Sequence, residues 1–399
     1  MNKNWDYKKI GDVMLVKRGG SPRPINKYLT DSEDGLNWIK ISDASASTKY
    51  IYETKQKITK DGLHKTRLVN EGDFLLSNSM SFGRPYIMKT SGCIHDGWLV
   101  LREKESGLLD KNFLYLLLGS PYIFEQFDML AAGSTVRNLN IGLVSSVSIP
   151  IPPLEEQKQI VAVLDKAFTA IDQAKANIEK NLQNAKDLFQ SKLNEIFTKK
   201  GEGWEEKYLG DICGFQNGFA FKSKLFKPDG IPVLRISSIQ DDQVVDHRPV
   251  FTDPNNYKED LSKYLVQNGD LLIAMSGATT GKIGFNNTGR TFLLNQRVGK
   301  FEPSDNLNLK FLYYYLSTKV DENLAISAGA AQPNLSTQQI KGFLIPMPSL
   351  AEQKDIVAKL NELHSETATL EMIYQQKSAL LTEFNKSTLQ KAFAGELSR

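Results

Sequence analysis

A long internal repeat constrains the fold of this chain more than any other feature. Residues 5–13 (WDYKKIGDV) are matched by residues 204–212 (WEEKYLGDI), which lie 199 positions later. Residues 149–161 (IPIPPLEEQKQIV) are matched by residues 345–357 (IPMPSLAEQKDIV), which lie 196 positions later. The matches keep their order and nearly one offset. They indicate a duplicated domain, because the repeats of solenoid proteins are only about 20–50 residues long.

Each repeat begins with a globular part, at residues 1–150 and 203–346. Both parts contain short runs of β-forming residues, separated by Gly, Pro, Asn and Ser. A helical pattern near residues 113–118 recurs near residues 311–316. The sequence therefore predicts an α+β protein with two similar mixed α/β domains.

Each globular part is followed by a region that we expect to form one long helix, at residues 151–202 and 347–399. No Pro or Gly occurs between residues 155 and 199, and apolar side chains recur at steps of three and four residues. Two amphipathic helices could each pack on their own domain. However, each helix would span about 60 Å, more than the width of such a domain, so we expect a coiled coil. Its predicted seam consists of Leu164, Ile171, Ile178, Leu360, Leu363, Leu370 and Leu381.

The order domain, helix, domain, helix sets the direction of the two helices. If the two ends of each domain lie close together, the first helix runs from the first domain to the second, and the second helix must return. We therefore expect an antiparallel coiled coil with a pseudo-two-fold axis. Two similar globular domains would be held at a fixed separation.

Composition narrows the possible classes of protein. The 49 basic and 46 acidic residues give a net charge of only +3, so any nucleic-acid-binding surface has to be local. Cys93 and Cys213 form no paired motif, as expected for a reducing compartment. No stretch approaches the ~18 consecutive apolar residues of a membrane span. We therefore expect a cytoplasmic protein that does not contact a membrane.

The sequence shows no recognisable catalytic or metal-binding motif. The nearest match to a phosphate-binding loop is residues 277–283, with three residues between its glycines where such loops have four. Ile283 stands where Ser or Thr would bind Mg²⁺. The four histidines are scattered along the chain and show no metal-ligand spacing. The sequence therefore predicts a chain without a catalytic residue, metal or cofactor of its own.

Polar loops at matched positions in the two globular parts are the remaining candidates for function. The pairs are residues 17–24 with 216–224, 79–84 with 276–282, and 132–140 with 328–336. Arg, Lys, Asn and Gln bind DNA bases and phosphates, and the loops differ in composition between the repeats. We therefore expect two similar domains that recognise two different DNA sequences. The candidate DNA-binding residues are Arg18, Arg23, Arg84, Arg137, Asn138, Asn217, Lys222, Lys282, Gln332 and Asn334.

On these features the chain resembles the specificity subunits of Type I restriction-modification systems. The most specific motifs are residues 149–158 with their twin 345–354, and Trp5 and Trp204 with the Gly-Asp pairs that follow them. The resemblance implies a bipartite target in double-stranded DNA and two methyltransferase (modification) subunits as partners. It also implies restriction subunits that act as translocases. S-adenosylmethionine, ATP and Mg²⁺ are then expected only on those partner subunits.

Two other functions remain open at this point. The chain could be a self-contained DNA methyltransferase or nuclease with unrecognised motifs. It could also be a coiled-coil adaptor that does not contact DNA. The resemblance does not identify individual base-contacting residues, because the recognition domains vary widely within the family.

Overall fold

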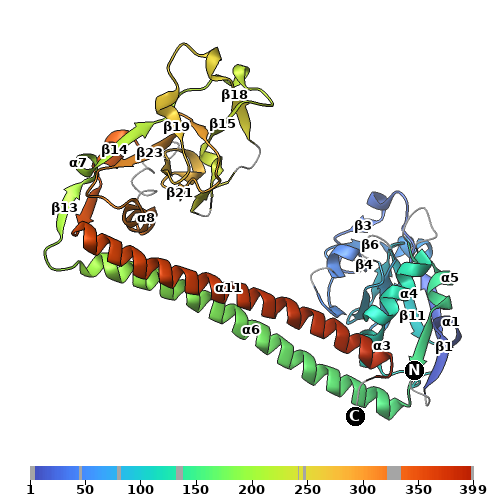
Figure 1. Ribbon diagram of the computed structural model, residues 1–399. Coiled ribbons are helices and arrows are strands. Elements are labelled where there is room, and N and C mark those ends of the chain that lie inside the picture. The colour runs from blue at the N-terminus through green and yellow to red at the C-terminus, as the bar shows by residue number, and fades with distance from the viewer. Residues whose placement is uncertain are drawn as a thin grey trace. The chain divides into compact units, whose positions relative to one another are not determined.

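The computed structural model describes residues 5–44, 47–78, 82–131, 138–240, 242–245, 249–320 and 334–396. The chain divides into two compact units. Unit 1 comprises residues 1–179 and 374–399, and unit 2 comprises residues 180–373. Two long helices, α6 (Leu154–Lys199) and α11 (Leu350–Phe393), each contribute one segment to both units (Figure 1). Head 1 is the part of unit 1 that precedes α6, and head 2 is the part of unit 2 between α6 and α11.

Head 1 is a mixed α/β domain, as predicted. One five-stranded sheet has the order β2 (Met14–Arg18), β11 (Trp98–Glu103), β8 (Phe74–Ser77), β9 (Pro85–Met88) and β5 (Tyr50–Ile51). The other has the order β3 (Leu29–Thr30), β6 (Lys57–Ile58), β4 (Leu36–Ile39), β10 (Gly92–Ile94) and β7 (Arg67–Val69). Its described α-helices are α1 (Ile10–Val13), α2 (Ile41–Ala44), α3 (Lys111–Leu118), α4 (Pro121–Ala131) and α5 (Ile141–Ser146).

Head 2 repeats this plan with small changes. Its larger sheet has the order β14 (Cys213–Asn217), β23 (Val298–Pro303), β20 (Leu271–Ala274), β21 (Ile283–Phe285), β17 (Gln243–Val244) and β16 (Ile239–Gln240). Its smaller sheet has the order β18 (Val250–Thr252), β15 (Ile231–Leu234), β22 (Phe292–Leu294) and β19 (Leu265–Val266). Its described helices include α7 (Leu209–Ile212), α8 (Leu309–Ser317) and α10 (Thr337–Lys341).

The first and last strands of each head pair with each other. In head 1, β1 (Asp6–Lys9) pairs antiparallel with β12 (Ser148–Ile151). In head 2, β13 (Glu205–Tyr208) pairs in the same way with β24 (Leu344–Met347). The two ends of each head therefore lie close together, and the chain continues from the second end into a long helix. The predicted antiparallel course of the helices depends on this closeness of the ends.

The two long helices lie side by side and antiparallel within each unit (Figure 1). In unit 1 the start of α6 meets the end of α11, where Leu164 and Phe393 belong to one buried cluster. In unit 2 the end of α6 meets the start of α11, where Leu193 and Leu360 share another. The predicted antiparallel pairing is therefore confirmed in both units.

The seam follows the predicted positions along most of its length. Leu164, Ile171 and Leu360 are at most 4% exposed. Ile178, Leu363 and Leu381 are half-buried.

Leu370 corrects the prediction, because it is 42% exposed. After the buried Thr367, the covered positions continue at Glu371 and Tyr374, so the step after Thr367 is four residues instead of three. An α-helix has 3.6 residues per turn, and a strict 3.5-residue pattern drifts off the contact face. The extra residue in this step compensates for that drift and leaves Leu370 outside the seam.

Candidate nucleic-acid interface

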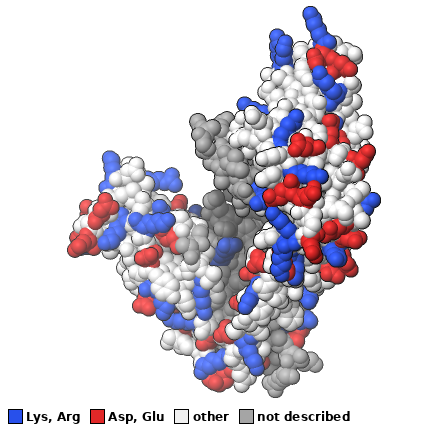
Figure 2. Space-filling view, turned by 90° about the vertical axis from the view of Figure 1, so that its left-hand side faces the viewer, with Lys and Arg blue, Asp and Glu red and all other residues white. Residues whose placement is uncertain are grey.

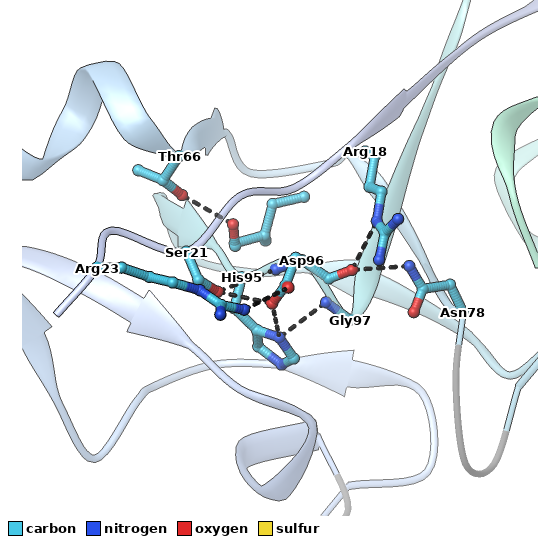
Figure 3. Close-up of polar contacts among 9 residues, drawn as sticks. Arg18, Ser21, Arg23, Thr66, Asn78, His95, Asp96 and Gly97 are labelled. Carbon is cyan, nitrogen blue, oxygen red and sulfur yellow. Dashed lines mark hydrogen bonds and ion pairs between the residues drawn. The ribbon is translucent and has the colours of Figure 1, made fainter. Parts of the chain in front are cut away.

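Three loops and the end of β8 meet beside the sheet of head 1 that contains β2, β11 and β8; Figure 3 shows the polar side chains of two of these loops and of Asn78. We call this meeting point crossing 1 and define it as residues 18–23, 78, 95–97, 138 and 139. Four backbone hydrogen bonds of 2.8–3.1 Å hold it together: Gly19 N to Trp98 O, Gly20 N to Ile94 O, Asn78 N to Gly97 O, and Leu139 N to Asn78 O.

Head 2 contains the same arrangement at the matching positions. Crossing 2 comprises residues 217–222, 275, 295–297, 334 and 335. Its four equivalent backbone hydrogen bonds measure 2.8–3.2 Å: Gly218 N to Val298 O, Phe219 N to Leu294 O, Met275 N to Arg297 O, and Leu335 N to Met275 O. The repeat therefore preserves the backbone of the crossing while the side chains on it change.

A glycine permits the closest approach in each crossing. A Cβ atom added to Gly19 would lie 2.1 Å from the carbonyl oxygen of His95, and one added to Gly218 would lie 1.9 Å from that of Asn295. No side chain tolerates such contacts with backbone atoms. The Gly in both loops is thus required for the loops to cross at all.

Asp96 is the centre of the polar contacts in crossing 1. Its carboxylate accepts a hydrogen bond of 2.7 Å from the Ser21 hydroxyl and lies 3.8 Å from the guanidinium of Arg23. The hydrogen bond from Ser21 holds the pKa of Asp96 below its usual value. The Arg23 side chain is 83% exposed, so this ion pair is weak and leaves the cation available to a ligand.

His95 contributes a neutral ring to crossing 1. Its Nδ1 atom accepts a hydrogen bond of 2.8 Å from the backbone N–H of Gly97. Burial lowers the pKa of His95 below its usual value. The approach of its Nδ1 to Asp96 at 3.6 Å is therefore not an ion pair at neutral pH.

Arg18 is held in place from one side. Its Nε atom donates to the carbonyl oxygen of Asp96 at 2.9 Å, and the amide of Asn78 donates to the same oxygen at 2.8 Å. Its own carbonyl oxygen accepts a hydrogen bond from Nε of Arg67 at 2.8 Å. An arginine that is fixed through Nε keeps its two terminal nitrogens for the bidentate contact that arginine makes with guanine.

Crossing 2 carries a different set of side chains on the same backbone. Asn217 and Arg297 occupy the positions of Arg18 and Gly97, so the arginine of crossing 2 lies on a different loop from the two arginines of crossing 1. Gln296, at the position of Asp96, is exposed, as is Arg297. The side-chain carbonyl of Asn217 accepts a hydrogen bond of 2.9 Å from the Thr337 hydroxyl. Crossing 2 therefore presents the amide of Gln296 where crossing 1 presents the carboxylate of Asp96.

The structure brings six of the ten candidate residues into the two crossings. Crossing 1 contains Arg18, Arg23 and Asn138, and crossing 2 contains Asn217, Lys222 and Asn334. Lys222 is exposed, and Asn334 forms a backbone bridge with Ser276.

Two further candidates lie outside the crossings. Arg84 directly precedes β9 and lines a groove of about 1000 Å³, together with Phe82, Phe124 and Lys386. Lys282 is exposed directly before β21. The last two candidates, Arg137 and Gln332, lie outside the described residues.

The turns of residues 95–97 and 295–297 were missed by sequence reasoning. Each turn joins two strands, β10 to β11 in head 1 and β22 to β23 in head 2. A signal was present, because each turn is a polar triplet that interrupts an apolar run at a matched offset of 200 positions. Residues 295–297 consist of Asn, Gln and Arg, the residue types expected to bind DNA, but neither turn was among the three pairs of loops predicted from the sequence.

Charge is not concentrated on the face of the molecule drawn in Figure 2, where basic and acidic side chains are interspersed. Within the described ranges, no group of three or more His, Cys, Asp or Glu side chains could hold a metal ion. No helix in that part of the chain is long and apolar enough to cross a membrane.

Comparison with known proteins identifies the family. The model of the Type I restriction modification DNA specificity domain matches residues 2–184 and again residues 201–379. The MjaVIII specificity subunit of Methanocaldococcus jannaschii is 25% identical over 90% of this chain and 86% of its own length. The EcoBI specificity subunit of Escherichia coli is 25% identical over 74% of this chain and 68% of its own length.

Solved structures show the same fold. One is a chain from a structure that concerns complex assembly of the type I R-M system. It is 21% identical to this chain with a TM-score of 0.76, and the match covers 100% of this chain and 99% of the other. The HsdS subunit from Thermoanaerobacter tengcongensis is 20% identical with a TM-score of 0.66, covering 100% and 98%. With two copies of the matched domain, this chain belongs to the family of Type I restriction modification DNA specificity domains.

Proposed function

We propose that this chain recognises a bipartite sequence in double-stranded DNA and directs the catalytic subunits of a Type I restriction-modification complex to it. The observation that carries the proposal is the pair of crossings. Their backbone hydrogen bonds are the same, while the polar side chains they present differ. Two similar frames with different hydrogen-bonding groups are suited to two different half-sites.

The catalytic work belongs to partners in this proposal. Two methyltransferase subunits would supply S-adenosylmethionine, and restriction subunits would supply ATP-driven translocation and cleavage with Mg²⁺. The chain itself would catalyse nothing and bind no cofactor, and it would act in the cytoplasm. The relatives support this division, because they are named as specificity subunits of Type I restriction enzymes.

Recognition is assigned to particular side chains. Arg18 in crossing 1 and Arg297 in crossing 2 each suit a bidentate contact with a guanine in the major groove. Gln296 suits an adenine, and Asp96 suits the amino group of a cytosine. Arg84 and Lys282 lie apart from the crossings and suit phosphate contacts, which orient the protein on DNA.

Methyl transfer and DNA cleavage, each measured with the purified chain, separate this function from its enzymatic rivals. Purified chain is mixed with DNA and labelled S-adenosylmethionine, with and without the methyltransferase subunits. We expect methyl transfer only in the mixture with those subunits. Transfer by the chain alone would show a self-contained methyltransferase, and cleavage by the chain alone would show a nuclease.

A gel-shift assay at low salt tests the adaptor alternative. We expect the complex with methyltransferase subunits to bind one bipartite sequence more tightly than random DNA. Equal binding by the methyltransferase subunits without this chain would show that the chain does not contact DNA.

A further inference from the structure

A buried glutamine lies in the first turn of each long helix. Gln157 in α6 and Gln353 in α11 are both 0% exposed. They occupy equivalent positions in the two repeats, four residues after Pro153 and Ser349, respectively. A fully buried amide is stable only when its hydrogen-bonding groups are satisfied, so its partners indicate what it holds together.

In unit 1, Gln157 connects three parts of the chain. Its Oε1 atom accepts a hydrogen bond of 2.7 Å from the backbone N–H of Asp110, the residue that caps α3. Its Nε2 atom donates to the carbonyl oxygen of Leu108 at 3.0 Å and to that of Pro152 at 2.9 Å. The amide thus joins α6, the loop before α3 and the segment that follows β12.

In unit 2, Gln353 makes the same three bonds. Its Oε1 atom accepts from the backbone N–H of Asn308, which caps α8, at 2.8 Å. Its Nε2 atom donates to the carbonyl oxygens of Asn306 and Pro348, both at 3.0 Å. Each bond lies within 0.1 Å of its counterpart in unit 1.

Glutamine is the residue type whose chemistry fits this junction. One acceptor and two donors on a single side chain match one backbone N–H and two carbonyl groups. A glutamate has no donor when ionised, and a methionine of similar length satisfies none of the three groups. The junction therefore depends on the amide itself and not on the volume that it fills.

We propose that Gln157 and Gln353 are positioning residues that fix the direction in which each long helix leaves its head, and so set the spacing at which the half-sites are recognised. The proposal rests on the proposed function above. Helix α6 has 46 residues and is therefore about 70 Å long. A tilt of about 5° at its start would displace its far end by about 6 Å, close to the rise of two base pairs.

A matched pair of variants in unit 2 tests the proposal. Gln353→Met removes the junction amide. Asn286→Leu removes another amide that is 0% exposed, which donates to the carbonyl oxygens of Gln267 and Arg290, both at 2.9 Å, within head 2. Both variants lose a buried amide with two donors, but only Gln353 joins a head to a long helix.

The assay uses the full chain in complex with its methyltransferase subunits. DNA substrates carry both half-sites with spacers of different length, and methylation is measured well below the melting temperatures of the variants. We expect both variants to melt at lower temperature. The measured quantity is the ratio of methylation at spacers one base pair longer or shorter to methylation at the preferred spacer. This ratio should rise about tenfold in Gln353→Met only, and the half-site sequences should not change.

Several outcomes would overturn the inference. One is that Gln353→Met keeps the sharp spacer preference of the unmodified chain. Another is that Asn286→Leu broadens the preference as much as Gln353→Met does. Either result would show that the glutamine only stabilises the fold. If Gln353→Met does not fold, Gln353→Glu serves instead, since it keeps the shape and loses donors, and an unchanged spacer preference would overturn the proposal. Failure of the unmodified complex to methylate any bipartite site would instead refute the proposed function.

Discussion

The end of α11 docks on head 1 through Phe393. This side chain is fully buried, and its ring meets that of Phe113 in α3 edge to face, with 5.5 Å between centroids. The variant Phe393→Ala removes this ring from a close-packed cluster. Truncation of a buried phenylalanine to alanine costs about 3–5 kcal/mol, because apolar burial is lost and a cavity remains.

Hydrogen exchange measures this cost where it arises. Since Phe393 is at the end of α11, we expect the loss to appear as local opening of residues 380–393. At 1.4 kcal/mol for each tenfold change, their slowest amides should exchange roughly 140- to 3700-fold faster. The amides of α6 and α11 that lie in unit 2 should keep their exchange rates.

A control on the same helix makes the result interpretable. Phe384 is 58% exposed, so Phe384→Ala should change the opening free energy by less than about 0.5 kcal/mol. Unchanged exchange at the end of α11 in Phe393→Ala would refute the reasoning. So would equal acceleration in the two variants, because the effect would then not come from the docked ring.

Three further predictions concern the seam, the crossing and the length of the helix. Ile171→Asp places a charge in the buried seam and should lower the melting temperature of the protein, measured by calorimetry, by several degrees. Leu370→Asp, at an exposed position, should leave the melting temperature nearly unchanged, and equal effects of the two variants would contradict the observed seam. Gly218→Ala should weaken recognition of one half-site, because its Cβ would lie 1.9 Å from the carbonyl oxygen of Asn295; DNA binding with both half-sites intact would count against crossing 2. Four residues inserted after Ile178 lengthen α6 by about 6 Å and should lengthen the preferred spacer by one or two base pairs. If the methylated sites keep the original spacer, α6 does not set the distance between the half-sites.

The large features of the fold were predictable because they depend on local pattern. The repeat is visible in matched motifs, and the absence of Pro and Gly from residues 155–199 is enough to predict α6. The helical patterns near residues 113–118 and 311–316 correspond to α3 and α8. The error at Leu370 arose because a 3.5-residue pattern was extended past the point where the contact face of the helix shifts.

The site was only partly predictable because its contacts are distant in sequence. Arg18 was selected for its residue type, but the atom that holds it belongs to Asp96, 78 residues away. Gln157 was visible only as part of a motif, and its partner Asp110 is 47 residues away. Arg297 lies in a strand connection with no distinctive composition, and only the register of the two heads shows that it occupies the position of Gly97.

Mapping of methylated sites tests the central claim, that the two heads recognise two separate half-sites through their crossings. Cells that contain the complete system would carry the unmodified chain, Arg18→Gln or Arg297→Gln, and modified sites would be sequenced across the genome. The unmodified chain should yield two short half-sites separated by an unspecified spacer. Each variant should lose about 5- to 150-fold discrimination at one base pair, as expected for a bidentate contact worth about 1–3 kcal/mol, and the affected base pairs should lie in different half-sites. A contiguous target, or two variants that alter the same half-site, would contradict the account.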